Sequence, residues 1–405
     1  MDTDESSKQI LTFMEKNFKN LYGKMPDHFS EKSKNALYPI LRLMIEAKQM
    51  YHKYKSQIEY IIPTDSELEK KQLYQYIPNE IKTIIEKMNH PHKVMFKVHQ
   101  RNITVFFYNN HHNHSQYIEY IENIYIWLYV AYRFSFGECS QNLEIFIYLT
   151  DETKHLPRTK SSSKTPVIDE INANTGLTTG CKHINEIHVY RKEEWFKVFI
   201  HETFHNLGME FSEMDINSAC KKLFSHFPIK KNILFYETYC EVWAEIIYAL
   251  FLSFADTKEK DADKIIDNSK KYISIMQLFS IIQCVKVLRH NKLHYVNLYD
   301  YKPSMEQKHR NYIEKTEVLA YYVFKSVLLF HLNDFIEWCS LHNGKKVIQF
   351  SKSQLNISQY CDLIIFTYKF HNDTYVTIYD IINNWFENHK KTNKYEYITL
   401  RMTPF

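Results

Sequence analysis

Glycine is scarce in this chain, with only 6 glycines among 405 residues. No glycine-rich phosphate-binding loop is present, which argues against a nucleotide-driven enzyme. Strong charge bias is lacking as well: the formal net charge is +4, which is too small to predict nucleic-acid binding. The longest uncharged apolar stretch, residues 246–255, is shorter than the about 20 residues that a membrane-spanning helix needs.

The cysteines argue against a protein that is held together by a disulfide framework. There are seven, scattered along the chain without a CxxC pair: Cys139, Cys181, Cys220, Cys240, Cys284, Cys339 and Cys361. An odd, scattered set is typical of free thiols in a reducing compartment rather than of a disulfide framework. The first nine residues are polar and acidic, unlike a signal peptide. We therefore expect a soluble cytoplasmic protein that binds neither nucleic acid nor a membrane.

The remaining composition is that of a globular protein with a large core. Hydrophobic residues make up 44% of the chain and charged residues 24%. A chain of this length exceeds one minimal domain. We expect an α+β fold with a helical region over 1–90, a core of strands and helices over 91–255 and a mainly helical region over 256–405, closed by a short strand over 397–402.

Strand patterns are confined to the central region. β-branched and aromatic residues at 93–98 and 103–108 predict a hairpin or two adjacent strands. A long helix over 116–134 and a buried strand over 143–150 should follow. Residues 172–180 are typical of an exposed or edge strand, and 186–190 of a short strand.

From Arg191 the sequence predicts a helix that is apolar on most sides and therefore buried. Glu193 and Glu194 fall in its expected first turn, where the helix dipole favours acids. Gly208 could serve as the left-handed residue that ends it. Three of the six glycines, Gly176, Gly180 and Gly208, lie in this part of the chain. In so glycine-poor a chain, this indicates backbone geometry that other residues cannot adopt.

The central observation is the run His201-Glu202-Thr203-Phe204-His205. Residues four apart lie on one helical face, so both imidazoles can point at one ion. Neutral imidazole suits zinc, and Glu202 can reach a metal-bound water without ligating the metal. The alternative is two histidines satisfied within a buried helix. Polar groups are costly there without partners, which favours one bound Zn²⁺.

A catalytic zinc usually takes a third protein ligand. The next predicted helix, over 234–254, carries Glu237, Glu241 and Glu245 at spacings of four, so that all three lie near one face. One of them should be the third ligand. Another could hydrogen-bond a ligand histidine and fix its tautomer.

HETFH followed by a glutamate on a later helix resembles the zincin metallopeptidases, specifically the gluzincin branch. The resemblance covers roughly residues 93–255. It implies that an edge strand binds the substrate backbone, that Glu241 is the third ligand and that Glu245 lies behind it. Glu237 as the ligand with Glu241 behind it is the close alternative. The metzincin pattern HExxHxxGxxH is not met, since its last position is Phe211.

The resemblance implies peptide-bond hydrolysis with a zinc-activated water and Glu202 as the general base. A further group should stabilise the oxyanion; the candidates are Tyr321, Tyr322, His294 and His309. Other acidic and histidine residues could line the cleft or bind a cation, although solvated loops are their plainer interpretation: Glu210, Glu213, Asp215, His111, His112 and His114. The rival hypothesis is a zincin-fold structural or interaction protein without peptidase activity. The Lys-, Asn- and Tyr-rich composition resembles that of proteins of large DNA viruses.

Overall fold

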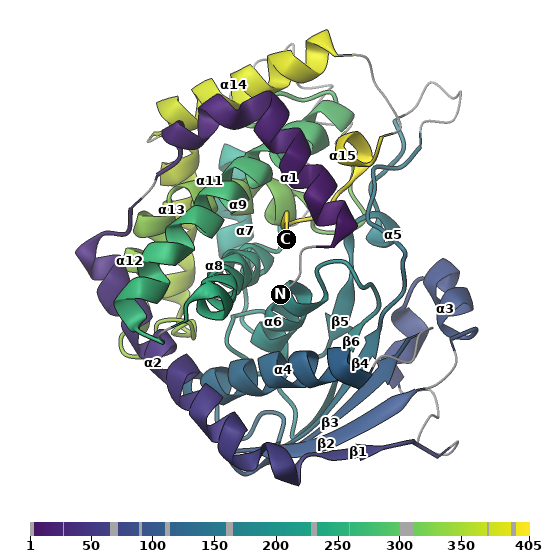
Figure 1. The fold of residues 1–405 in the computed structure, drawn as a ribbon. Coiled ribbons are helices and arrows are strands. Elements are labelled where there is room, and N and C mark those ends of the chain that lie inside the picture. Colours follow the sequence, from purple (N-terminus) through teal and green to yellow (C-terminus); the bar gives the residue numbers. More distant parts are fainter. Residues whose placement is uncertain are drawn as a thin grey trace.

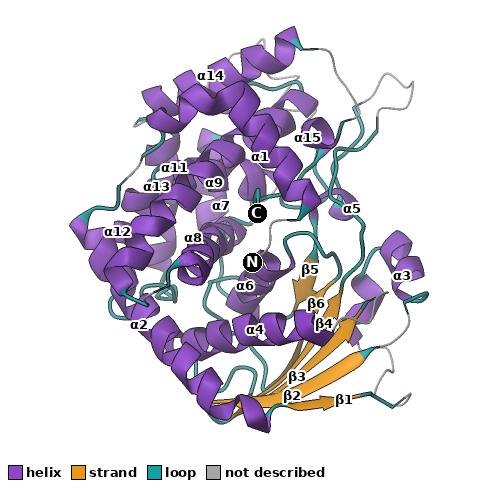
Figure 2. Cartoon of the chain, viewed as in Figure 1, coloured by secondary structure: helices purple, strands orange, loops and turns teal. Residues whose placement is uncertain are grey.

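The computed structural model describes residues 4–26, 28–64, 72–88, 91–109, 114–158, 165–227, 233–258, 260–299, 312–370, 372–389 and 394–405. One mixed sheet and the helices around it form an α+β fold, which confirms the predicted class (Figures 1 and 2). The sheet and the helices next to it lie in the lower part of Figure 1, and the remaining helices form the upper part.

The sheet has six strands in the order β1-β2-β3-β4-β6-β5. Their bounds are β1 Glu59–Ile61, β2 His92–Val98, β3 Arg101–Tyr108, β4 Asn142–Tyr148, β5 Gly176–Thr178 and β6 Ile184–Val189. Strands β3, β4 and β6 are parallel, whereas β1, β2 and β5 each run antiparallel to a neighbour. The hairpin, the buried strand and the edge strand expected from the sequence are confirmed, although β5 is shorter than the predicted 172–180.

Helices make up most of the remaining chain. The first half contains α1 (Glu5–Phe18), η1 (Lys19–Lys24), α2 (Glu31–Tyr54), η2 (Lys55–Gln57), η4 (Gln72–Tyr76), α3 (Asn79–Ile85), α4 (His114–Phe134), α5 (Glu170–Ala173) and α6 (Trp195–Asn206). The second half contains α7 (Asn217–His226), α8 (Tyr236–Asp256), α9 (Ala262–His290), η5 (Tyr295–Leu298), η7 (Leu319–Phe324), α11 (Lys325–Phe330), α12 (Leu332–Asn343), α13 (Gln354–Lys369), α14 (Asp373–Asn388) and α15 (Tyr395–Ile398).

The two faces of the sheet are covered by different helices. Side chains such as Phe107 and Val189 belong to the main core, together with residues of α4 and α6. Their neighbours Phe106 and Tyr148 point to the other face, where they pack against α3 in a smaller core. This alternation follows from the period of two along a strand. The main core also includes residues of α1, α2, α9 and α14, so the three predicted regions share one continuous core.

Helices α8 and α9 are buried through most of their length. Among the described residues, these two are long and apolar enough to cross a membrane by length and composition. In α8, 94% of the apolar window is buried inside the protein, and in α9 the share is 83%. Burial on all sides explains their apolar character without a membrane.

Several local predictions are wrong. Residues 59–61 form β1 within a region expected to be helical throughout. The terminal strand over 397–402 is replaced by α15 and an extended segment with a single isolated bridge between Thr399 and His155. Within the region expected to be mainly helical, we also predict one continuous helix over 314–341, but the structure breaks it into a π-helix, η7, and the α-helices α11 and α12.

The prediction of seven free cysteines is also wrong. Cys139 and Cys181 form a disulfide between the loop after α4 and the β5–β6 hairpin, and the other five cysteines are free. The pairing is a long-range contact across 42 residues, so spacing along the chain does not reveal it.

Candidate metal centre

Helix α6 carries the HETFH motif. Its first turn differs from the prediction, whereas its last turn agrees with it. It begins at Trp195, so Glu194 precedes the helix and adopts a left-handed conformation with φ 60°. The first-turn role predicted for Glu193 and Glu194 is therefore wrong. The other end confirms the role of Gly208, which has φ +63°. The amides of Gly208 and Met209 donate to carbonyls of the last turn, which is the Schellman arrangement.

Three ligand-type atoms converge between α6 and α8. The Nε2 atoms of His201 and His205 are 3.2 Å apart. The Oε2 atom of Glu237 lies 3.2 Å from His201 Nε2 and 3.3 Å from His205 Nε2. Among the described residues, these three side chains form the one group whose atoms lie close enough together to hold a metal ion.

The spacing of these atoms fits zinc. Tetrahedral zinc with bonds of about 2.0–2.1 Å has ligand atoms about 3.3 Å apart. In addition, Glu237 Oε2 is buried and makes no hydrogen bond of normal geometry. A buried carboxylate oxygen without a donor is costly, and a cation among the three atoms would satisfy it.

Each histidine has a further carboxylate on its other ring nitrogen. Glu241 Oε1 lies 2.9 Å from His201 Nδ1, and Glu210 Oε1 lies 3.3 Å from His205 Nδ1. Carboxylates in such positions commonly fix the tautomer of a ligand histidine, which would leave Nε2 facing the cluster. Glu241 therefore stands behind His201 and outside the cluster. The cluster thus contains Glu237, the alternative ligand, and not Glu241, the ligand that the resemblance implies, and the choice of ligand stays a prediction.

Charge at the cluster favours a cation. Burial lowers the pKa of the His201 imidazole, but Glu241 and Glu237 outweigh burial and raise it to about 9. Burial likewise opposes the charged form of His205, and Cys240 and Glu237 raise its pKa well above the ordinary value. Burial raises the pKa of Glu237, yet the two imidazoles more than reverse this and lower it. Metal binding would displace the protons that these groups hold.

Glu202 lies beside the cluster and outside it. Its carboxylate, together with His201, Tyr321 and Met402, lines a small cavity of about 40 Å³. That volume is enough for one or a few water molecules. Burial raises the pKa of Glu202, although the two imidazoles partly offset this effect. Gly176 of the edge strand β5 reaches the same cavity: an added Cβ would lie 2.9 Å from Glu202 Oε1.

Gly208, with φ +63°, meets the prediction that the clustered glycines serve backbone geometry, whereas Gly176 has no positive φ and is required by the close approach of Val198 and Glu202. Gly180 has neither feature, because nothing lies within 4 Å of a Cβ added there and its φ is not in the left-handed region.

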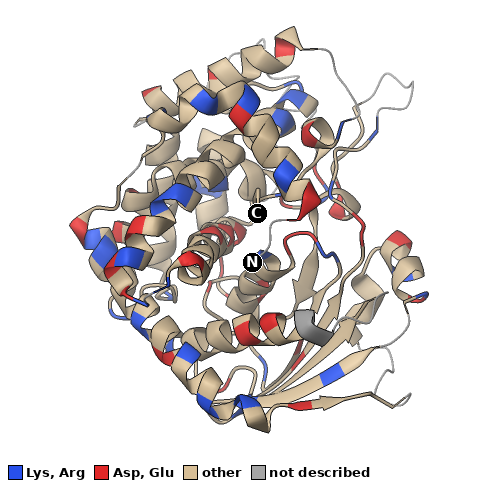
Figure 3. Ribbon diagram, in the orientation of Figure 1, with Lys and Arg blue, Asp and Glu red and all other residues tan. Residues whose placement is uncertain are grey.

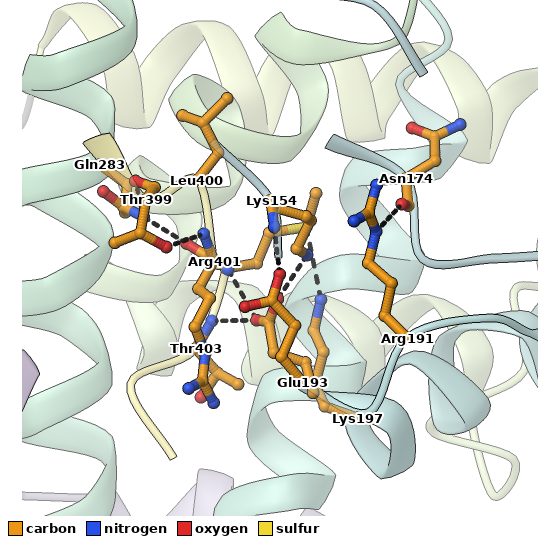
Figure 4. Close-up of polar contacts among 12 residues, drawn as sticks. Lys154, Asn174, Arg191, Glu193, Lys197, Gln283, Thr399, Leu400, Arg401 and Thr403 are labelled. Atoms are coloured by element: carbon orange, nitrogen blue, oxygen red, sulfur yellow. Dashed lines mark hydrogen bonds and ion pairs between the residues drawn. The ribbon is translucent and has the colours of Figure 1, made fainter. Parts of the chain in front are cut away.

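A set of buried lysines pairs with the acids behind the cluster. Lys197 of α6 contacts Glu241, and Lys325 of α11 lies 2.9 Å from Glu245. Glu245 is therefore an ion-pair partner of Lys325 rather than a neighbour of the histidines. A further pair joins Lys154 to Glu194, next to Glu193 (Figure 4). Figure 3 shows acidic positions on α8 in the interior, whereas many other charges lie on the outer helices.

Sequence reasoning missed these lysines, although one signal was present. Lys197 stands in an otherwise apolar helix and is fully buried. A buried ammonium group needs an anionic partner, so a lysine in such a helix predicts a buried acid nearby.

Of the four oxyanion candidates, the structure brings only Tyr321 to the cavity. Its ring centroid lies 6.1 Å from that of His201, and it belongs to the π-helix η7. Tyr322 donates to the carbonyl of Leu400, and His294 pairs with Asp380 away from the cluster. His309 lies outside the described residues.

Among the described residues, Glu213 and Asp215 do not line the cavity. Glu213 pairs with Lys352, and Asp215 accepts from the amide of Asn217 at the start of α7. His111 and His112 lie outside the described residues, as does the side chain of His114.

A larger cavity, about 1090 Å³, lies between α2, α4 and the β2–β3 hairpin. Its wall combines aromatic side chains such as Tyr125 and Tyr129 with charges of both signs. None of the three clustered residues lines it, whereas His201 lines the smaller cavity.

Comparison of the chain with protein-family models, curated proteins and solved structures finds no match in any of the three. What the fold and the site define is an α+β protein with a partly buried cluster of two histidines and one carboxylate, and with a further glutamate, Glu202, lining the cavity beside it.

Proposed function

We propose that the chain is a zinc-dependent peptide-bond hydrolase in which His201, His205 and Glu237 hold one Zn²⁺ and Glu202 is the general base. The observation that carries this proposal is the convergence of three ligand atoms at separations of 3.2–3.3 Å. The element order supports it too, since an antiparallel edge strand, the HExxH helix and a glutamate helix follow one another as in the gluzincins.

The residues around the cavity can perform hydrolysis. Zinc, when bound, would lower the pKa of a water molecule and polarise the scissile carbonyl. Burial raises the pKa of Glu202 toward neutral pH. The carboxylate can then take up a proton from the water and pass it to the leaving amine. Burial raises the pKa of Tyr321 well above 10, so its hydroxyl stays protonated and can donate to an oxyanion.

The edge strand supplies a place for a peptide substrate. In the described sheet β5 pairs only with β6, and Thr175 and Gly176 line the cavity with Glu202. A peptide in extended form could add its backbone to the free edge of β5 and so present one carbonyl to the cavity. The proposed substrate is therefore a peptide or protein segment without secondary structure.

Metal analysis is the first test. The purified protein should contain about one zinc per chain, and His201→Ala should lose it. His294→Ala is the matched control, because this histidine pairs with Asp380 far from the cluster. Zinc that persists in His201→Ala would contradict the assignment of the site.

Activity is the second test. Glu202→Gln should keep the metal but lower the cleavage of a peptide library by about 10²- to 10⁴-fold, the usual contribution of a general base. Glu213 is an exposed glutamate that pairs with Lys352, so the Glu213→Gln variant should cleave the library as fast as the wild type does. Cleavage that survives Glu202→Gln would overturn the mechanism.

The small size of the cavity favours a second candidate. A volume of about 40 Å³ holds water but not a whole peptide residue, so a substrate would have to lie outside the cavity and present one carbonyl to it, or the walls would have to move. A zinc-bound interaction module without peptidase activity needs no opening. Stoichiometric zinc in a wild-type protein that cleaves no member of the library would favour this candidate.

A further inference from the structure

The segment over residues 399–405 runs through the interior next to the cavity. Leu400 and Thr403 are fully buried, and Met402 is 4% exposed. Its backbone is held from several sides: the amides of Met402 and Thr403 each donate to Glu194 Oε1 at 2.6 Å. The carbonyl of Leu400 accepts from Tyr322 at 2.6 Å. Figure 4 shows this segment in contact with groups from both halves of the molecule.

Met402 links this segment to the candidate metal centre. Its side chain forms part of the wall of the cavity that contains Glu202 and His201. Its carbonyl accepts a hydrogen bond of 2.9 Å from Lys325, and its Sδ lies 3.6 Å from Lys197 Nζ. Both ammonium groups are fully buried, so each depends on the partners that surround it.

These two lysines hold the acids behind the metal ligands. Lys197 contacts Glu241, which in turn lies 2.9 Å from His201 Nδ1. Lys325 pairs with Glu245, one helical turn further along α8. If Met402 left its place, both ammonium groups would lose a buried partner. Such groups turn toward new partners or toward water, and Glu241 would lose its fixed position.

We propose that the 399–405 segment is a positioning element of the metal centre, with Met402 setting Lys197 and Lys325 and through them the carboxylate that orients His201. This inference rests on the proposed function. It assigns to Met402 a role in metal affinity that the HExxH motif does not include.

Full-length variants test the role of Met402. Outer-shell partners of a metal site typically contribute 10- to 100-fold to metal affinity. Met402 acts on Glu241 only through Lys197, so Met402→Ala should raise the zinc dissociation constant less than loss of Glu241 would, by about 5- to 10-fold, in a chelator competition. Met402→Leu refills the volume but lacks the sulfur that contacts Lys197, so it should recover only part of the affinity.

Leu400→Ala is the matched control. Leu400 is equally buried and packs in the same small apolar cluster as Met402, but it does not line the cavity. Its loss of thermal stability should be similar, while zinc affinity should stay within about threefold of the wild type. Should Met402→Ala fail to fold, Met402→Val makes a smaller void and should still weaken zinc binding by at least about threefold.

The outcomes separate the two proposals. Equal zinc affinities in Met402→Ala and Leu400→Ala, with zinc bound normally by the wild type, would overturn the positioning role alone. A wild-type protein that takes up no zinc would overturn the proposed function and this inference together.

Discussion

Replacement of Gly176 by alanine tests how the edge strand and the general base fit together. A Cβ at this position would lie 2.8 Å from Val198 Cγ1 and 2.9 Å from Glu202 Oε1. Ordinary van der Waals contacts begin at about 3.4 Å, so either β5 or the contacting side chain must move by about 0.6 Å. Val198 is held in the buried helix α6, which leaves the Glu202 carboxylate and β5 as the parts that move.

The size of the effect follows from this displacement. Overpacking of a close contact usually costs about 1–3 kcal/mol of stability. Catalysis should suffer more than folding does, because misplacement of a catalytic group by 1 Å can lower the rate about 100-fold. We expect Gly176→Ala to lower kcat/KM for a peptide substrate by about 10- to 100-fold. Zinc affinity should change by less than about threefold, since none of the three nearest atoms belongs to a ligand.

The assay compares kcat/KM, zinc affinity and melting temperature for Gly176→Ala and Gly180→Ala. Gly180 precedes the β5–β6 turn, and a Cβ added there meets nothing within 4 Å. Gly180→Ala should therefore match the wild type in all three measurements. Equal activity in the two variants would refute the close fit between β5 and Glu202.

Three further predictions concern the ligands, pH and the disulfide. Glu237→Ala should abolish stoichiometric zinc binding, whereas Glu241→Ala should weaken it by about 10- to 100-fold, as measured by chelator competition; the reverse order would contradict the ligand assignment. Without zinc, the pKa of His201 is raised from 6.5 to about 9, so its protonation stabilises the folded protein fully below pH 6.5 and this contribution is lost as pH rises through 9. Zinc affinity should rise over the same interval, and calorimetry in buffers of different ionisation enthalpy should detect proton release; a pH-independent affinity would contradict this. The Cys139–Cys181 bridge closes a long loop and should contribute about 4 kcal/mol by chain entropy, so reduction should lower the melting temperature. A non-reducing peptide map of the native protein would show whether the bridge forms in the expected reducing cytoplasm.

The central region could be predicted because its patterns are local. The strands β2, β3 and β4 show β-branched and aromatic runs, and α6 shows the spacing of a buried helix with two histidines one turn apart. These features depend on neighbours in sequence. The three-residue strand β1 lies in a short run, Ile58 to Ile62, that also contains β-branched and aromatic residues, but its side chains are exposed and its pairing with β2 is a long-range contact.

The choice among the acids of α8 could not be made from spacing. Glu237, Glu241 and Glu245 share one helical face, so periodicity treats them alike. What distinguishes them is how far α8 slides past α6, which places Glu237 opposite the Nε2 atoms and Glu241 opposite Nδ1 of His201.

The burial of the 399–405 segment is equally non-local. Its partners Lys154, Glu194 and Lys325 come from three separate parts of the chain. The sequence of this segment, which mixes polar and apolar residues, predicts a strand over 397–402. The extended conformation that it adopts is instead explained by its hydrogen bonds to buried charged residues.

The most direct measurement is a crystal structure of zinc-loaded protein with anomalous data collected at the zinc edge. One peak should lie within about 2.0–2.2 Å of His201 Nε2, His205 Nε2 and a Glu237 carboxylate oxygen, with Glu202 unligated beside it. A peak bound by Glu241 instead of Glu237, or no peak between α6 and α8, would contradict the account.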